Sequence, residues 1–250
     1  MQREVDELSM EPTSIIILVL SILFISTFTR SALGFGDALI AMPLLALVVG
    51  IQVATPLTAF GASTIALTIL LSGGWRNVDI KAAWRLIISS LVGIPIGLFF
   101  LKTAPEPLIK GALGALLIAF GLYNLIAPKL PTFRNEKLAY AFGLIAGILG
   151  GAYNTNGPPV VVYGTLRGWS PASFRFTLQA YFLPTGGMIL ISHGLAGLWT
   201  PNVLRLYAYA LPIIMLAIFL GGRANKTLSG GRFNRIIYAA IVLMGILLFV

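Results

Sequence analysis

The sequence predicts an all-α polytopic membrane protein built from two inverted repeats. Each repeat would hold one broken, re-entrant helical segment followed by three transmembrane helices. The first observation is the composition, because 58% hydrophobic and 10% charged residues with a mean hydropathy of +0.93 are typical of multi-span membrane proteins. The second is segment length, since the apolar runs reach about 20 residues, enough for a helix to cross a bilayer and about twice a barrel strand. The third is that two of these runs are interrupted by small, polar and helix-breaking residues.

The apolar segments follow one another in a repeated order of one broken and three whole segments. They lie at about 15–50 (broken near 34–38), 54–72, 84–101, 107–127, 138–166 (broken near 150–157), 172–192, 202–221 and 233–249. No stretch resembles an extramembrane domain. We therefore predict a single transmembrane transporter domain, residues 1–250, with repeat one at about 15–128 and repeat two at about 136–250.

Glycine and proline positions in the two halves support a duplication. A shift of 116 residues pairs Gly34 with Gly150 and Pro43 with Pro159. The alternative is chance, because both residue types are common in such sequences. Matched breaks in two halves are nevertheless the pattern of transporters whose site lies where the repeats meet.

The basic residues indicate that the halves are inverted. If each broken segment turns inside the membrane and leaves on the side it entered, each half makes three crossings and most loop charges fall on one side. These charges are Arg76, Lys81, Lys129, Arg134, Lys137, Arg167, Arg223, Lys226, Arg232 and Arg235. The positive-inside rule makes this side cytoplasmic. We therefore expect a bacterial cytoplasmic (inner) membrane protein with both termini outside the cytoplasm.

The second break carries the clearest candidate binding residues. Lipid provides no hydrogen-bond partner for opened backbone, so such a break persists only where protein or a water-filled cavity satisfies it. Pro158 suits the first turn of a helix, so a half-helix should begin near it and present free N–H groups to an anion. Alternatively, the side chains only cap the helix and pack the turn. The candidate substrate-binding residues here are Gly150, Gly151, Tyr153, Asn154, Thr155, Asn156 and Gly157.

The first break adds Gly34 and Gly36 as candidates, together with Arg30 and Asp37. An acid at this depth costs about 2.5 to 3.5 kcal/mol on insertion scales, so Asp37 should have a partner. It could cap the half-helix beginning at Ala38, pair with Arg30, or carry a coupling proton. Arg30 could contact the anion or reach the lipid headgroups.

The helix after Pro171 supplies two further candidates. Arg175 and Gln179 are four residues apart and share a face. The planar guanidinium of Arg175 matches two oxygens of a sulfonate or carboxylate, although a headgroup-facing arginine is the alternative. Thr64 is a weaker substrate-binding candidate. His193 is expected to be an ordinary surface residue in an outer loop.

Enzyme chemistry is not indicated. The chain has no cysteine and one histidine, and it shows no close carboxylate pair, so we predict no enzyme, no metal site and no cofactor. The net charge of +9 is spread over short loops, which argues against a nucleic-acid partner.

The paired signatures Gly34-Phe35-Gly36-Asp37 with Pro43, and Gly147-Ile-Leu-Gly150-Gly151 with Gly157-Pro158-Pro159, resemble those of the TauE/SafE (TSUP) family over nearly the whole chain. The family usually shows a more glycine-rich first motif, whereas here Asp37 and Ala38 replace small residues. The resemblance implies a secondary transporter that exports sulfite, sulfoacetate or related organosulfonates by alternating access, driven by a proton or another ion. Its partners would be a small anionic substrate, the lipid bilayer and a coupling proton or cation, and a homodimer stays open. A passive anion channel, or a transporter of another small organic anion, is the alternative.

Overall fold

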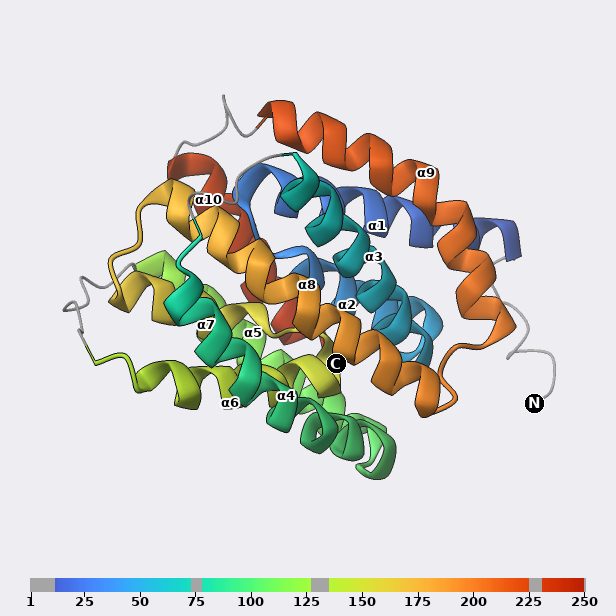
Figure 1. Cartoon of the computed structure of the whole chain (residues 1–250). Coiled ribbons are helices and arrows are strands. Elements are labelled where there is room, and N and C mark those ends of the chain that lie inside the picture. The colour runs from blue at the N-terminus through green and yellow to red at the C-terminus, as the bar shows by residue number, and fades with distance from the viewer. Residues whose placement is uncertain (1–11, 73–77, 127–134, 225–230, 250) are drawn as a thin grey trace.

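The computed structural model describes residues 12–72, 78–126, 135–224 and 231–249, and all regular structure in these ranges is helical. Figure 1 shows the arrangement. The helices are α1 (Pro12–Leu33), α2 (Asp37–Val49), α3 (Ile51–Leu71), α4 (Ile80–Thr103), α5 (Glu106–Ile126), α6 (Leu138–Tyr153), α7 (Gly157–Leu166), α8 (Pro171–Leu195), α9 (Pro201–Ala224) and α10 (Gly231–Leu247). Five of them, α1, α3, α4, α5 and α9, are long and apolar enough to cross a membrane. The prediction of an all-helical polytopic membrane protein is thus confirmed.

Both predicted interruptions exist. α1 ends at Leu33 and α2 begins at Asp37, and Gly34 and Gly36 between them have φ values of 94° and 101°. Only glycine adopts this region without steric cost, which explains the two glycines. In each half the helix before the interruption contacts the helix after it, α1 with α2 and α6 with α7.

The second interruption is narrower than predicted. α6 continues to Tyr153 and α7 begins at Gly157, so Gly150 and Gly151 lie inside a helix rather than in the break near 150–157. Asn154, which ends α6, has φ 55° and is the one non-glycine residue with positive φ in the described ranges. Asparagine tolerates the left-handed conformation better than other side chains, so it can terminate a helix where glycine would be usual.

Glycines let α4 and α6 pack backbone to backbone. A Cβ added at Gly93 or Gly97 of α4 would collide with the α6 backbone, and one added at Gly147 or Gly151 of α6 would collide with the α4 backbone. Small residues permit such close approach of membrane helices, where van der Waals contact rather than water exclusion drives association. We call these four positions the α4–α6 glycine seam.

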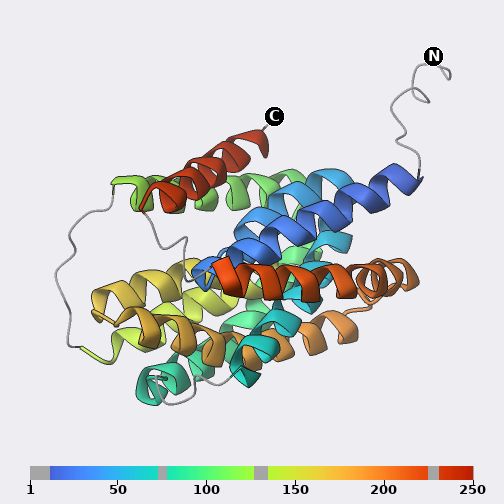
Figure 2. The same ribbon diagram turned by 90° about the horizontal axis from the view of Figure 1, so that it is seen from above.

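Four of the remaining helices pack in two pairs, α5 with α10 and α1 with α9. Figure 2 shows α10 beside α5 at one edge of the molecule and α1 beside α9. α8 contacts α3, α4, α6 and α7 and runs through the middle of the view in Figure 1. Its side chains Thr177, Gln179 and Thr185 are fully buried. Because protein rather than lipid surrounds much of α8, it can carry polar groups that a lipid-facing helix could not.

The glycine seam generates a stability prediction. Gly147→Ala places a methyl group against the backbone of Ser90, so α4 and α6 must separate, and overpacking of this kind costs about 1–3 kcal/mol. We expect a lower melting temperature in detergent. Gly187→Ala is the matched control, because nothing lies within 4 Å of the added Cβ. Equal melting temperatures for the two variants would contradict a close-packed seam.

Candidate functional site

The two interruptions line one cavity. It is bounded by the end of α1, both interruptions, the first turns of α2 and α7, one residue of α3 and two residues of α8. The described lining residues are Arg30, Phe35, Gly36, Asp37, Ala38, Leu39, Ala62, Asn154, Thr155, Asn156, Gly157, Pro158, Phe182 and Gly186. We call it the central cavity. Its free volume is about 20 Å³, which is room for about one water molecule.

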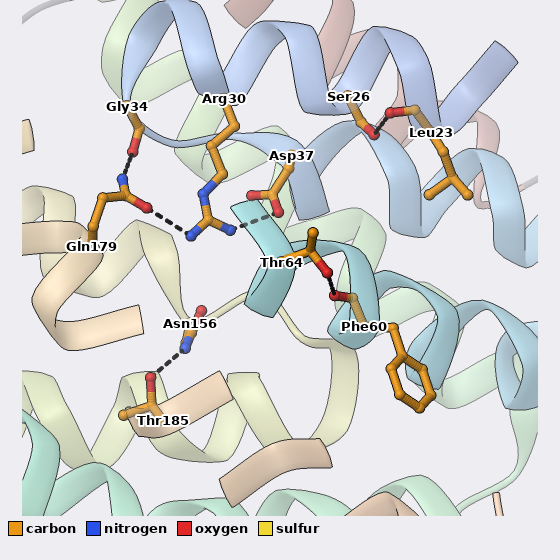
Figure 3. A network of polar contacts seen from close by, with 10 residues as sticks. All are labelled: Leu23, Ser26, Arg30, Gly34, Asp37, Phe60, Thr64, Asn156, Gln179 and Thr185. Carbon is orange, nitrogen blue, oxygen red and sulfur yellow. Dashed lines mark hydrogen bonds and ion pairs between the residues drawn. The ribbon is translucent and has the colours of Figure 1, made fainter. Parts of the chain in front are cut away.

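Arg30 is the one cation among these lining residues, and its guanidinium is held from several sides (Figure 3). One terminal nitrogen, Nη1, donates to Asp37 Oδ2 at 2.8 Å and the other, Nη2, to Gln179 Oε1 at 2.9 Å. Its Nε is buried without a protein partner, and the guanidinium carbon lies 4.6 Å from the ring centroid of Phe182. With the residue only 1% exposed, Arg30 is a protein-buried charge rather than a headgroup-facing one.

Asp37 pairs with Arg30, one of the three roles left open for it. Asp37 is 7% exposed and is already the first residue of α2, with Gly36 at the N-cap position, so it is not the N-cap of a helix beginning at Ala38. As the first residue of α2, Asp37 also benefits from the positive end of the helix dipole. A buried ion pair with further hydrogen bonds offsets much of the desolvation cost that either charge alone would carry.

Gln179 connects this ion pair to the backbone of the first interruption. Its Nε2 donates to the carbonyl oxygen of Gly34 at 2.7 Å, while its Oε1 accepts from Arg30. Gln179 therefore ties α8 to the end of α1 and to the first residue of the interruption, as Figure 3 shows. The carbonyl of Gly34, opened by the turn, obtains the hydrogen bond that lipid could not provide.

The side chains of the second interruption do not cap α7. Asn156 precedes the helix but makes no capping bond; its Nδ2 instead donates to Thr185 Oγ1 on α8 at 3.2 Å. Asn154 is buried, and its Nδ2 has no protein partner. Two amide side chains thus face the cavity, and one of them has an uncommitted donor.

The two helix starts differ in the donors they offer. The first N–H groups of a helix have no intrahelical partner. In α2, the first three residues, Asp37, Ala38 and Leu39, line the cavity, and each has a backbone N–H group. In α7, Pro158 and Pro159 lack N–H groups. α2 therefore contributes more backbone donors than α7, and Asn154 and Asn156 supply amide donors on the second side.

Comparison with known proteins matches this chain to one family. The sequence profile described as "Sulfite exporter TauE/SafE" matches residues 18–248. The chain belongs to the TauE/SafE family. A protein of Cupriavidus necator named "Probable sulfite/organosulfonate exporter TauE" is 23% identical over 224 residues, covering 88% of each chain. A "Probable membrane transporter protein" of Haemophilus influenzae is 31% identical over 146 residues, which cover 54% of this chain and 56% of the relative. No solved structure matches the chain.

Membership confirms the resemblance noted from the two glycine and proline signatures. It makes the chain a multi-pass membrane protein of a transporter family rather than an enzyme. In the part of the chain that the structure describes, no three His, Cys, Asp or Glu side chains group as metal ligands.

This TauE/SafE protein brings seven of the predicted site residues to the central cavity: Arg30, Gly36, Asp37, Asn154, Thr155, Asn156 and Gly157. Gly34 and Gln179 are joined to Arg30 by the hydrogen bonds described above. Five predicted residues lie outside the lining: Tyr153, Gly150, Gly151, Thr64 and Arg175. Each of these five has another environment.

Gly151 packs against the backbone of Ile94, and a Cβ on Gly150 would lie 3.1 Å from both Asn156 and Ile189. Protein atoms therefore occupy the space beside both glycines, where a ligand had been expected. The hydroxyl of Thr64 lies 2.7 Å from the Tyr207 hydroxyl, which gives it a local partner away from the cavity.

The sequence also misplaced or missed several residues. His193, expected in a surface loop, lies in the last turn of α8 and is fully buried. Phe182, which lies under Arg30, and Thr185, which accepts from Asn156, were not predicted. Phe182 follows Gln179 by three residues, so extending the Gln179 face of α8 by one turn would have found it. Thr185, six residues after Gln179, lies on a different face.

The ion pair generates a stability prediction. Asp37→Leu leaves the Arg30 guanidinium buried without its carboxylate, and loss of one partner of a buried pair costs about 3–5 kcal/mol. Adding Arg30→Met removes the unpaired charge, so we expect the double variant to be more stable than Asp37→Leu alone. The free energy of unfolding in mixed micelles measures both. If the destabilisation of the double variant equals the sum of those of Asp37→Leu and Arg30→Met, the two side chains do not stabilise each other and the prediction is wrong.

Proposed function

We propose that this protein exports small sulfur-containing anions, such as sulfite, sulfoacetate or related organosulfonates, across the bacterial cytoplasmic membrane by alternating access. The observation that carries the proposal is the position of Arg30, a buried guanidinium that faces a cavity bounded by two helix starts. The printed name of the Cupriavidus necator relative supports the choice of substrate class.

The chemistry of the central cavity favours an anion over a cation. Arg30 Nε, Asn154 Nδ2 and the first amides of α2 are donors, and oxyanions accept several such bonds at once. Asp37 is the one carboxylate among the described lining residues, and it is committed to Arg30. A cation site is usually built with several carboxylate ligands, and the described lining residues contain no second carboxylate.

The small free volume means that the proposed substrate does not fit the central cavity in this conformation. A sulfite or sulfonate ion is several times larger than the single water that about 20 Å³ admits. Substrate entry therefore requires the helices around the cavity to separate. In a carrier such opening alternates between the two sides, and the Arg30, Asp37 and Gln179 contacts would break and re-form as α1, α2 and α8 move.

The two-repeat design belongs to the same proposal. One interruption from each half contributes to a single cavity, as expected of inverted repeats that meet at the membrane midplane. Within the single domain 1–250, the basic loops would then face the cytoplasm and both termini the opposite side.

Asp37 is the proposed coupling residue. With both side chains ionised the Arg30 and Asp37 pair is neutral, so a bound monovalent anion leaves one net negative charge in the cavity. Protonation of Asp37 removes that charge, and net charge is costly inside a membrane. Proton binding and anion binding therefore favour each other, as linkage requires. Arg30 is the charged side chain facing Asp37 among the described lining residues; Arg175 on α8 lies beyond Gly34.

Flux into proteoliposomes tests the function. We expect sulfite and sulfoacetate uptake to saturate with concentration. Asn156→Ala removes an amide donor, and Asn154→Gly removes the other while keeping the left-handed backbone at that position. Loss of a hydrogen bond to a charged group is worth about 1.5 kcal/mol or more, so each change should raise the half-saturating concentration about tenfold.

Asn124→Ala is the matched control, because Asn124 bonds to the Phe120 carbonyl within α5 and should leave half-saturation unchanged. Flux that rises linearly with concentration would favour the channel. Flux no greater than in empty liposomes, for every sulfur anion tried, would end the proposal.

Replacing Asp37 tests the coupling. Asp37→Asn keeps an oxygen that can accept from Arg30 but cannot titrate. Methanesulfonate is a useful probe because it stays ionised between acidic and neutral pH, whereas sulfite itself takes up protons. We expect wild-type binding to weaken as pH rises and the variant to bind with little pH dependence, as measured by calorimetry.

Asp79→Asn is the control for this test. Asp79 caps α4 and accepts from Trp169, away from the cavity, and asparagine caps helices about as well as aspartate. Its pH dependence should match that of the wild type. An unchanged pH dependence in Asp37→Asn would remove Asp37 from the coupling role.

A further inference from the structure

A second polar cavity lies where α1, α3 and α9 end and α8 begins. Its volume is about 340 Å³, and its described lining residues are Ser31, Thr68, Ile69, Ser72, Arg175, Ile218, Phe219, Gly222 and Arg223. This set includes two arginines and no carboxylate. We call it the outer cavity because it lies at the ends of these helices; in the proposed orientation, which puts Arg223 on the cytoplasmic side, it opens to the cytoplasm. A concave surface that holds charges of one sign attracts counter-ions.

Two groups at the outer cavity are buried without partners. Arg175 Nη2 donates to the backbone oxygen of Ser31 at 3.3 Å, but its Nε has no partner in the protein. The hydroxyl of the fully buried Ser31 also has none. Buried polar groups nearly always have a hydrogen-bond partner, so an ordered water or a bound ligand is expected at each of these two. A headgroup-facing arginine would extend away from the protein, whereas Arg175 is fixed against α1.

Arg223 supplies the second charge. It lies in the last turn of α9, is exposed, and its guanidinium carbon stands 4.1 Å from the ring centroid of Phe219. Stacking on an aromatic ring occupies the face of a guanidinium and leaves the N–H groups at its edge available. Arg175 thus offers N–H donors fixed against α1, and Arg223 offers N–H donors that are exposed.

A single layer of residues separates the outer cavity from the central one. Ser31 follows Arg30 directly in α1. The Cγ of Arg175 lies 3.5 Å from the point where a Cβ on Gly34 would be, and Gly34 accepts from Gln179, which also holds Arg30. Breaking the Gln179 bonds would open the partition between the two cavities.

We propose that Ser31, Arg175 and Arg223 form an outer binding site for small oxyanions at one mouth of the transport path. An anion binds there on its way to or from Arg30. The choice of sulfur oxyanions as ligand rests on the proposed function, but the existence of an anion site at these residues does not. Arg175 is then a substrate contact of the outer site rather than of the central cavity.

The absence of native cysteine permits a charge-rescue experiment. Arg223→Cys introduces a single thiol, which a membrane-impermeant methanethiosulfonate reagent can modify with either a trimethylammonium or a sulfonate group. We expect Arg223→Cys to raise the half-saturating concentration of sulfoacetate about tenfold, as for loss of a charge-assisted bond. The cationic reagent should restore most of the affinity and the anionic reagent should not. Sulfoacetate should also slow the modification.

Arg205→Cys is the matched control, because Arg205 is an exposed arginine in the first turns of the same helix. Neither reagent should change its sulfoacetate affinity. The proposal is overturned if Arg223→Cys retains wild-type affinity, or if both reagents act alike.

A phospholipid headgroup carries the same anionic chemistry, and a separate measurement distinguishes it. If lipid phosphate occupies the outer cavity, the Arg175→Gln and Arg223→Gln variants will carry less bound phospholipid than the wild type after purification in detergent, as measured by their phosphorus content. Their affinity for sulfoacetate will then equal that of the wild type. That result would overturn the proposal. Thiol protection by sulfoacetate is measured in detergent without any flux, so it tests the outer site even if the wild-type protein transports no sulfur anion.

Discussion

Backbone groups opened inside a membrane must find hydrogen-bond partners within the protein. At the first interruption, the Gly34 carbonyl accepts from Gln179, and Gln179 also holds Arg30 against Asp37. One connected network therefore satisfies the backbone, neutralises a buried carboxylate and presents a guanidinium to the cavity. The position of α8 in the protein interior follows from this requirement, because only a helix shielded from lipid could bring Gln179 to the break.

The interruptions could be read from the sequence because their signals are local. Gly34 and Gly36 permit positive φ, and Pro158 suits a helix start, so both breaks and the all-helical class were predictable. The exact limits of the second break were not. Glycines are common in loops, so Gly150 and Gly151 suggest a break; the structure instead places both in α6, where Gly151 admits the backbone of Ile94 from α4 and Gly150 packs against Asn156 and Ile189.

The sequence predicted many of the residues of the candidate site but not how they are arranged in space. Arg30 and Asp37 were recognised as ionisable residues that need partners, but the sequence left capping, pairing and proton coupling open. The structure shows that Asp37 pairs with Arg30, and coupling is a separate proposal for the same residue. The structure also places Arg175 in a different cavity from Asn156, although both lie near interruptions. The burial of His193 likewise depends on neighbours distant in the chain, which no local pattern records.

The α4–α6 glycine seam has a mechanical consequence. Helices in backbone contact slide or tilt only at a large cost, because no flexible side chains lie between them to rearrange. In the proposed transport cycle α4 and α6 would therefore move as one body. The rearrangement that exposes Arg30 to one side and then the other would fall on α1, α2 and α8, which meet at Arg30, Asp37 and Gln179 through side-chain hydrogen bonds.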